Sequence, residues 1–399
     1  MTDAALIIPH YQPLPFPVPV WFIKTFLIVG FLTHLLPMSI VFAGQPLAAF
    51  FLLVSKLMGG KACSLSQQGG GCAAYARRTA NELVGHLPVI LSVAITQGIV
   101  PLLFLQLLYG PLYYTSSIII AWPWLAIVPL LIVMYYGLYW VKAQLQKSEP
   151  VGVGPILMLV GTSAIAWVIG YLFVMNMTLM VKPELWHQFI GGAHGPVSSG
   201  LNWLRDPMIH PRYLHMLLEA VAISGGLLLI YGLYNAKKDA PYAQWLYQRG
   251  GGLIALAVAG VLWVDNALLL KVLPAGFVQQ LQGTDPLMHA LALAFVGGLG
   301  LSALLGMVNI ALRQTLIALV QLLSLLAGVA VFPVLRNSLR EFMVQGVIQP
   351  DAVPVQLQTD ILVAFLILTV GLLVYLAWLI GLVWRRYHHP APAHEAACP

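Results

Sequence analysis

His215 and Glu219 lie inside a long apolar stretch, HPRYLHMLLEAVAISGGLLLIYGLYNAKKD, residues 210–239. They are four residues apart, so they share one face of a helix. An imidazole and a carboxylate are expensive to bury in a membrane and need partners there. One interpretation is a metal or haem ligand beside an acid that handles protons. The alternative is a polar pair that bonds to itself or to a neighbouring helix.

Two further histidines lie in apolar stretches that are predicted to enter the same half of the membrane. His34 is found in FLTHLLPMSIVFAG and His289 in TDPLMHALALAFVGGLG. Together with His215 they form a candidate ligand set for a b-type haem, although each alone could bond to a backbone group or a lipid headgroup. His86 is expected to enter from the opposite side.

Asp265, in GVLWVDNALLLK, is a second acid within a predicted span. It could relay protons, or it could pair locally with Lys271 or Asn266. The aromatic stretch 109–124 is expected to form a belt at the membrane interface, with a quinone headgroup site as the alternative.

The composition places these residues in a membrane protein. The chain has 399 residues, of which 60% are hydrophobic and 8% charged, whereas a soluble domain carries about 25% charged residues. The excess of basic over acidic residues is expected at the cytoplasmic loops of such a protein and does not indicate nucleic acid. The sequence contains none of the phosphate-binding, zinc-protease or nucleophile-elbow motifs of soluble enzymes.

Apolar runs predict an all-α, polytopic integral membrane helix bundle of about nine transmembrane helices. The segments are 18–57, 84–109, 118–141, 153–181, 213–235, 251–273, 287–311, 315–335 and 361–384. The first run is predicted to be one long helix kinked at Pro37 and Pro46, with two spans separated by a tight break near Gly44 as the alternative. Residues 1–17 are an external lead-in, 18–386 a single transmembrane domain, and 387–399 a disordered cytoplasmic tail.

The distribution of basic residues predicts the orientation. Most Lys and Arg residues fall in the loops after the odd-numbered spans and in the C-terminal tail, whereas the opposite side holds Lys182, Arg205, Arg212, Lys271, Arg336 and Arg340. This bias places the N-terminus outside and the C-terminus in the cytoplasm. Cys63 and Cys72 then lie in a cytoplasmic loop, where free thiols are expected; a disulfide across the loop is the alternative if the loop lies outside the cell.

Several stretches, in order along the first two-thirds of the chain, resemble subunit I of the cytochrome bd quinol oxidases. The long first segment carries His34 three residues before Pro37, and RYLHMLLEAVAISGGLLLIYGLY is similar to the family's fifth span. The passage ITQGIVPLLFLQLLYGPLYYTSS looks like its second-to-third helix region, and LVGTSAIAWVIGYLFVMNMTLMVKPELW like its fourth span. The resemblance implies nine spans, an external N-terminus, and haem-ligand roles for His34 and His215.

The chain also departs from that family. Gln106 stands where the family has a buried acid, and Phe295 lies near its seventh-span methionine ligand, with His289 about two turns earlier as a candidate substitute. The long quinol-binding loop is replaced by the short link 274–286, and the Gly-Arg-Gln-Pro-Trp signature is missing. These departures weaken the case for quinol oxidation at the usual site and for oxygen reduction.

The sequence thus predicts a cytochrome bd-like subunit of the inner (plasma) membrane that binds b-type haem, with d-type haem as a variant, and transfers electrons in a respiratory complex. His34 and His215 are the predicted iron ligands, His289 is a third cofactor-binding candidate, and Glu219 is the candidate catalytic residue for proton handling. Expected partners are other membrane subunits or cytochrome c, lipid, and a quinone, but no nucleic acid. A haem-free structural partner subunit and a transporter are the competing interpretations.

Overall fold

The computed structural model describes residues 14–58, 71–147, 152–188 and 206–388. Within these ranges the chain is helical, and its extended residues form one isolated parallel bridge. Eight helices are long and apolar enough to cross a membrane: Val20–Leu57, Cys72–Ile119, Ala121–Leu145, Val153–Met180, Ile209–Asn235, Ala240–Val272, Pro286–Leu312 and Thr315–Val344. The prediction of an all-α, multi-pass membrane protein is confirmed, whereas the orientation in the membrane stays a prediction.

The ninth predicted span, 361–384, falls in α12 (Thr359–His388). The apolar part of α12 that the structure describes, Thr359–Leu372, is shorter than a span. The described part of the chain divides into two compact units, one within Lys24–Gln349 and one that joins the described residues up to Ile23 to those from Pro350 onward. In the second unit, the Phe16 amide donates to Pro354 O (2.9 Å) and the Gln356 amide donates to Phe16 O (2.9 Å).

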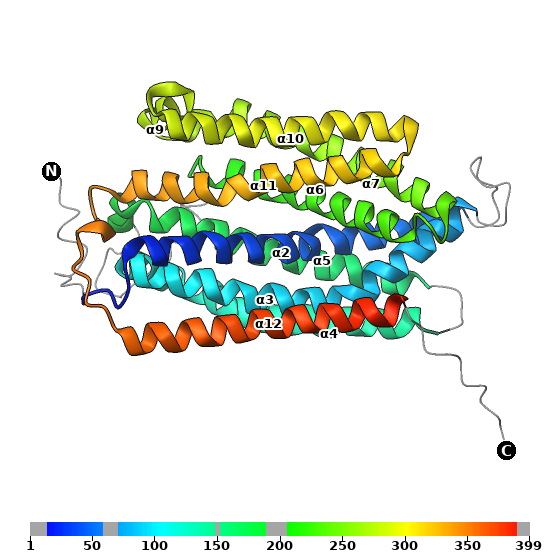
Figure 1. The fold of residues 1–399 in the computed structure, drawn as a ribbon, viewed down its shortest axis with the longest axis horizontal. Coiled ribbons are helices and arrows are strands. Elements are labelled where there is room, and N and C mark those ends of the chain that lie inside the picture. The colour runs from blue at the N-terminus through cyan, green and yellow to red at the C-terminus, as the bar shows by residue number, and fades with distance from the viewer. Residues whose placement is uncertain (1–13, 59–70, 148–151, 189–205, 389–399) are drawn as a thin grey trace, which may run out of the picture. The chain divides into compact units, whose positions relative to one another are not determined.

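Helix α2 (Val20–Leu57) confirms the prediction of one long first helix, because it runs through both Pro37 and Pro46. Its 38 residues correspond to about 57 Å at 1.5 Å per residue, well above a hydrocarbon core of about 30 Å. Figure 1 shows it (dark blue) beside α5 (Val153–Met180).

Helix α3 (Cys72–Ile119) begins twelve residues before the predicted span (84 − 72) and ends ten residues after it (119 − 109). The early start takes in polar residues such as Arg78 and Glu82, which an apolar window does not count. Near the expected end, Tyr109 has non-helical angles (φ −130°, ψ 27°) two residues before Pro111. A proline within a helix removes a hydrogen bond and kinks the chain, and here the helix resumes until α4 (Ala121–Leu145) begins.

Helices α6 (Ile209–Asn235) and α7 (Ala240–Val264) form a close antiparallel pair. The approach depends on glycine, since a Cβ on Gly225 would lie 2.9 Å from the Gly250 carbonyl oxygen. Asp239 caps the N-terminus of α7, where its side chain accepts a hydrogen bond from the Tyr242 amide (3.2 Å). It continues into a π-helical turn, η3 (Asp265–Leu269), and then α8 (Leu270–Val272).

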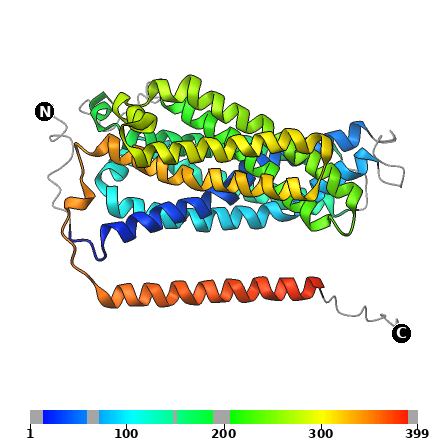
Figure 2. The ribbon, with the colours of Figure 1, turned by 45° about the horizontal axis from the view of Figure 1, so that its top comes forward.

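Helix α10 (Pro286–Leu312) packs against α7 and against α11 (Thr315–Val344), as Figures 1 and 2 both show. Short α9 (Ala275–Gln279) and the turn η4 (Gln280–Thr284) precede it. Helix α11 continues past the predicted end at 335. Arg336 and Arg340, which the sequence analysis counted on the external side beyond this span, therefore belong to the helix itself.

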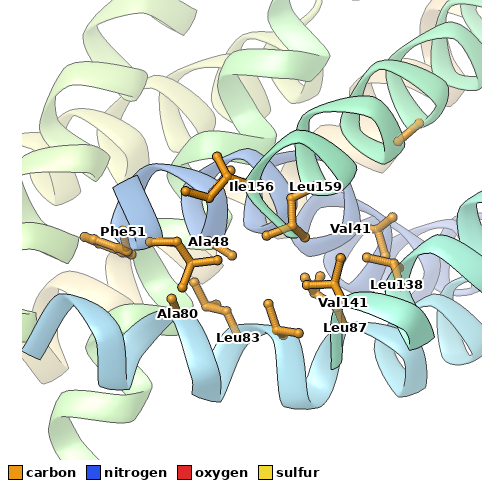
Figure 3. Packing of buried hydrophobic residues seen from close by; sticks show 14 of the residues in the cluster. Val41, Ala48, Phe51, Ala80, Leu83, Leu87, Leu138, Val141, Ile156 and Leu159 are labelled. Carbon is orange, nitrogen blue, oxygen red and sulfur yellow. The ribbon is translucent and has the colours of Figure 1, made fainter. Parts of the chain in front are cut away.

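The apolar core of the first half lies among α2, α3, α4 and α5 (Figure 3). Each helix contributes small or branched side chains, including Val41, Ala48, Leu83, Leu138 and Leu159. These side chains pack the four helices together, and Val41 also lines the cavity described below.

The prediction of a free thiol at Cys72 is wrong, because Cys72 is disulfide-bonded. The prediction rested on the cytoplasmic side assigned to the loop from the distribution of Lys and Arg residues, which carries no information about cysteine pairing. The two other cysteines, Cys63 and Cys398, lie outside the described residues.

Candidate functional site

A cavity of about 1020 Å³ lies within the unit Lys24–Gln349, between helices of both halves of the chain. Its walls are mainly apolar and include Leu27, Phe31 and Met38 of α2, and Phe295 of α10. Typical cofactor and ligand pockets measure about 300–1,000 Å³. The volume of this cavity is therefore at the upper end of the range for cofactor and ligand pockets.

His215 lines this cavity and is 3% exposed. Its Nδ1 lies 2.7 Å from Oδ1 of Asp265 on η3. The ring stacks on Phe332 (centroids 4.8 Å apart, planes at 20°) and faces Phe295 at 6.2 Å. The other ring nitrogen, Nε2, is buried with no hydrogen-bond partner. Because a carboxylate only accepts, the hydrogen bond assigns the proton to Nδ1 in the neutral imidazole and leaves the Nε2 lone pair free.

Glu219 lies one helical turn further along α6 and is also 3% exposed. Its Oε2 is 3.8 Å from Nε2 of His215, which is longer than a hydrogen bond. Both carboxylate oxygens are buried without a partner. The predicted His215–Glu219 pair therefore shares a helix face as expected, but it leaves polar atoms unsatisfied on both members.

His34 lines the same cavity from α2. Its Nδ1 lies 2.8 Å from the carbonyl oxygen of Ala94 on α3. A carbonyl accepts, so Nδ1 donates and Nε2 keeps its lone pair in the neutral ring. The ring is seated against Gly98, where a Cβ would come within 2.8 Å of Cε1 and 2.9 Å of Nδ1.

Asp265 has a partner other than those expected from the sequence. Its carboxylate bonds to His215 across helices, and among the described residues it makes no ion pair with Lys271. The bond comes from the first residue of a π-helical turn, a feature often found at functional sites. No pattern in the sequence indicates this turn, so the direction of the carboxylate could not be predicted.

His289 does not line the cavity. Its Nδ1 donates to the carbonyl oxygen of Leu281 in η4 (2.8 Å), close to the start of α10. His86 lies apart, as expected, with Nδ1 3.0 Å from the Tyr231 hydroxyl. Gln106, which stands where the resemblance expects an acid, accepts from the Tyr114 hydroxyl (3.0 Å).

Sequence reasoning missed two features of this site. Gly98 provides the space for His34, and it is one of many glycines in the chain. Arg212, Arg336 and Arg340 line the cavity, whereas the charge count placed them on the external side. The i, i+4 spacing of Arg336 and Arg340 is the only signal in the sequence that could have indicated a shared face.

The described residues contain no cluster of three or more His, Cys, Asp and Glu side chains that could hold a bare metal ion. Haem requires less of the protein, because the porphyrin supplies four ligands and the chain supplies only axial ones. Histidines that bind metals typically donate their second ring N–H to a carboxylate or a backbone carbonyl. His215 and His34 each show one of these two arrangements.

No protein-family model matches the chain, and no curated protein matches it. The resemblance to cytochrome bd subunit I therefore stays a prediction from the residues quoted above.

Proposed function

We propose that this chain is a haem-binding, electron-transferring subunit of a cytochrome bd-like complex in the inner (plasma) membrane. The observation that carries the proposal is that two histidines line one apolar cavity and make the same kind of hydrogen bond. Each donates from Nδ1 to an oxygen of another segment, Asp265 or Ala94, which leaves each Nε2 available to iron.

The residues fit a haem of the b type, with the d type as a variant. His215 and His34 would hold haem iron through Nε2, and the apolar walls would exclude water from the porphyrin. Bound haem supplies reversible one-electron chemistry between the ferrous and ferric states. Electron partners would be cytochrome c, a quinone or another membrane subunit, with lipid around the helices.

The protein groups around His215 have separate tasks in this proposal. Asp265 fixes the tautomer and orientation of the ring and makes the nitrogen more basic, as a second partner of a ligating histidine does. Stacking on Phe332 limits rotation of the ring. Glu219, 3.8 Å from Nε2, holds or releases a proton at its carboxylate when the charge nearby changes, because a buried charge needs compensation.

The test is a set of histidine variants of the full chain, purified in detergent. His215→Ala and His34→Ala are each expected to lose haem absorbance, while His86→Ala, which alters a histidine outside the cavity, retains it. Size-exclusion profiles show whether each variant is folded. Undiminished haem spectra in both cavity variants would overturn the ligand assignment.

A haem-free structural subunit is the second candidate. The bond from His215 to Asp265 favours it, because the same bond links α6 to η3 and polar bonds between membrane helices stabilise bundles. In that case purified protein contains no haem, and His215→Ala lowers only the melting temperature. Solute uptake by haem-free vesicles would instead support a transporter.

A further inference from the structure

Three arginines line the haem-sized cavity together. Arg212 comes from the first turn of α6, and Arg336 and Arg340 come from one face of α11, which packs against α6. A guanidinium group within a membrane protein normally faces a carboxylate, another anion or water.

The partners of these arginines are neutral. Arg212 Nη1 donates to the Thr178 hydroxyl (2.9 Å), and Arg340 Nη1 donates to Oδ1 of Asn337 (3.0 Å). The Arg336 guanidinium lies 4.2 Å from the centroid of the Phe31 ring. Among the described residues, none of the three forms an ion pair.

Nearby carboxylates outside the cavity already have other partners. Asp206 accepts from Lys182 (2.6 Å). Glu341 lies 3.2 Å from Lys24 Nζ and accepts from Asn337 Nδ2 (2.9 Å). These carboxylates are bound to lysine or amide groups, so they do not neutralise the arginines directly.

Within the cavity, three guanidinium groups stand against two carboxylates, Glu219 and Asp265. Asp265 is bonded to His215, which leaves Glu219 as the one acid with unsatisfied oxygens in this part of the described structure. The cavity therefore combines an apolar body with a surplus of positive charge carried by arginine. Arginine suits carboxylates in particular, because its planar fork donates two parallel hydrogen bonds.

We infer that Arg212, Arg336 and Arg340 form a binding site for the carboxylates of an amphiphile whose apolar body fills the cavity. The carboxylates would come either from the side chains of a porphyrin or from a fatty acid. The first source rests on the proposed function, whereas the second does not.

Paired ligands that differ only in the acid group test this inference on the full chain in detergent. Haem is compared with its dimethyl ester by optical titration, and palmitate is compared with hexadecanol by thermal shift. We expect the acid to bind roughly 10- to 100-fold more tightly than its neutral partner, the value of a charge-assisted hydrogen bond or two. Arg336→Gln and Arg340→Gln should remove most of that preference.

Arg249→Gln is the matched control, because Arg249 is exposed on α7 and lies 5.7 Å from the Trp245 ring centroid. It should keep the preference. Arg336→Lys and Arg340→Lys keep the positive charge but lack the planar guanidinium group. They should therefore retain part of the preference for the acid that the Gln variants lose. Preference for palmitate without haem uptake would support the arginine site while contradicting the haem proposal. Equal binding of acid and neutral ligands in both pairs, or a preference that survives both Gln variants, would overturn the inference.

Discussion

Replacing Gly98 with alanine should displace His34 without unfolding the protein. The added Cβ would lie 2.8 Å from Cε1 of His34 and 2.9 Å from Nδ1, whereas carbon atoms in contact prefer about 3.5 Å or more. The ring must therefore move by about 0.7 Å, and the cavity beside it has room for that movement. A shift away from α3 would lengthen the 2.8 Å bond from Nδ1 to Ala94 O toward about 3.5 Å, where it no longer counts as a hydrogen bond.

Two effects on stability then oppose each other. Alanine is favoured over glycine in a helix by about 1 kcal/mol, and overpacking costs about 1–3 kcal/mol. The net loss in free energy of unfolding should be about 0–2 kcal/mol. If His34 holds haem iron as proposed, haem affinity should fall about 10- to 100-fold, because the histidine would lose the partner that orients it.

The matched control is Gly85→Ala, in the same helix but with no atom within 4 Å of the position that its new methyl group would occupy. Thermal unfolding and haem titration in detergent compare the two variants. Gly85→Ala should be as stable as the parent or slightly more stable, with haem affinity unchanged. If Gly98→Ala binds haem as tightly as Gly85→Ala, the reasoning about His34 is refuted.

Two further substitutions test other contacts. Asp265→Asn keeps an oxygen that accepts from Nδ1 of His215 but removes the negative charge. The His215 ring then becomes a less basic ligand, which should raise the haem midpoint potential in a redox titration. An unchanged potential would contradict the proposed effect of Asp265 on His215. Gly225→Ala places a methyl 2.9 Å from the Gly250 carbonyl oxygen, which belongs to backbone that cannot rotate away, and should reduce the free energy of unfolding by about 1–3 kcal/mol. Gly297→Ala, with nothing within 4 Å, is its control; equal stability of these two glycine variants would contradict the packing of α6 on α7.

The sequence could predict the spans because membrane helices are recognised by length and apolar composition. It identified α2 as a single helix through two prolines, since neighbouring helices can satisfy the backbone groups that a proline frees. It misjudged the start of α3 and the end of α11, where polar residues continue the helix beyond the apolar run. At those ends, contacts between helices decide the boundary, and an apolar window cannot detect them.

For the site, spacing alone placed His215 and Glu219 on one face, and the structure shows both in the cavity with His34. The sequence could not predict the partner of the Asp265 carboxylate, because the π-helical turn η3 determines the direction of that side chain. The sequence also could not show that His289, unlike His34 and His215, lies outside the cavity. The carbonyl that His289 bonds to belongs to η4, a turn with no sequence signature. Contacts between distant segments supply this information.

The central claim is that the cavity holds haem through His215 and His34. A dithionite-reduced minus air-oxidised optical spectrum of the purified, monodisperse protein tests it most directly. We expect sharp α and Soret bands of b-type haem, and an additional red-shifted band would indicate haem of the d type. A flat spectrum from folded protein, unchanged after incubation with haem, would contradict the claim.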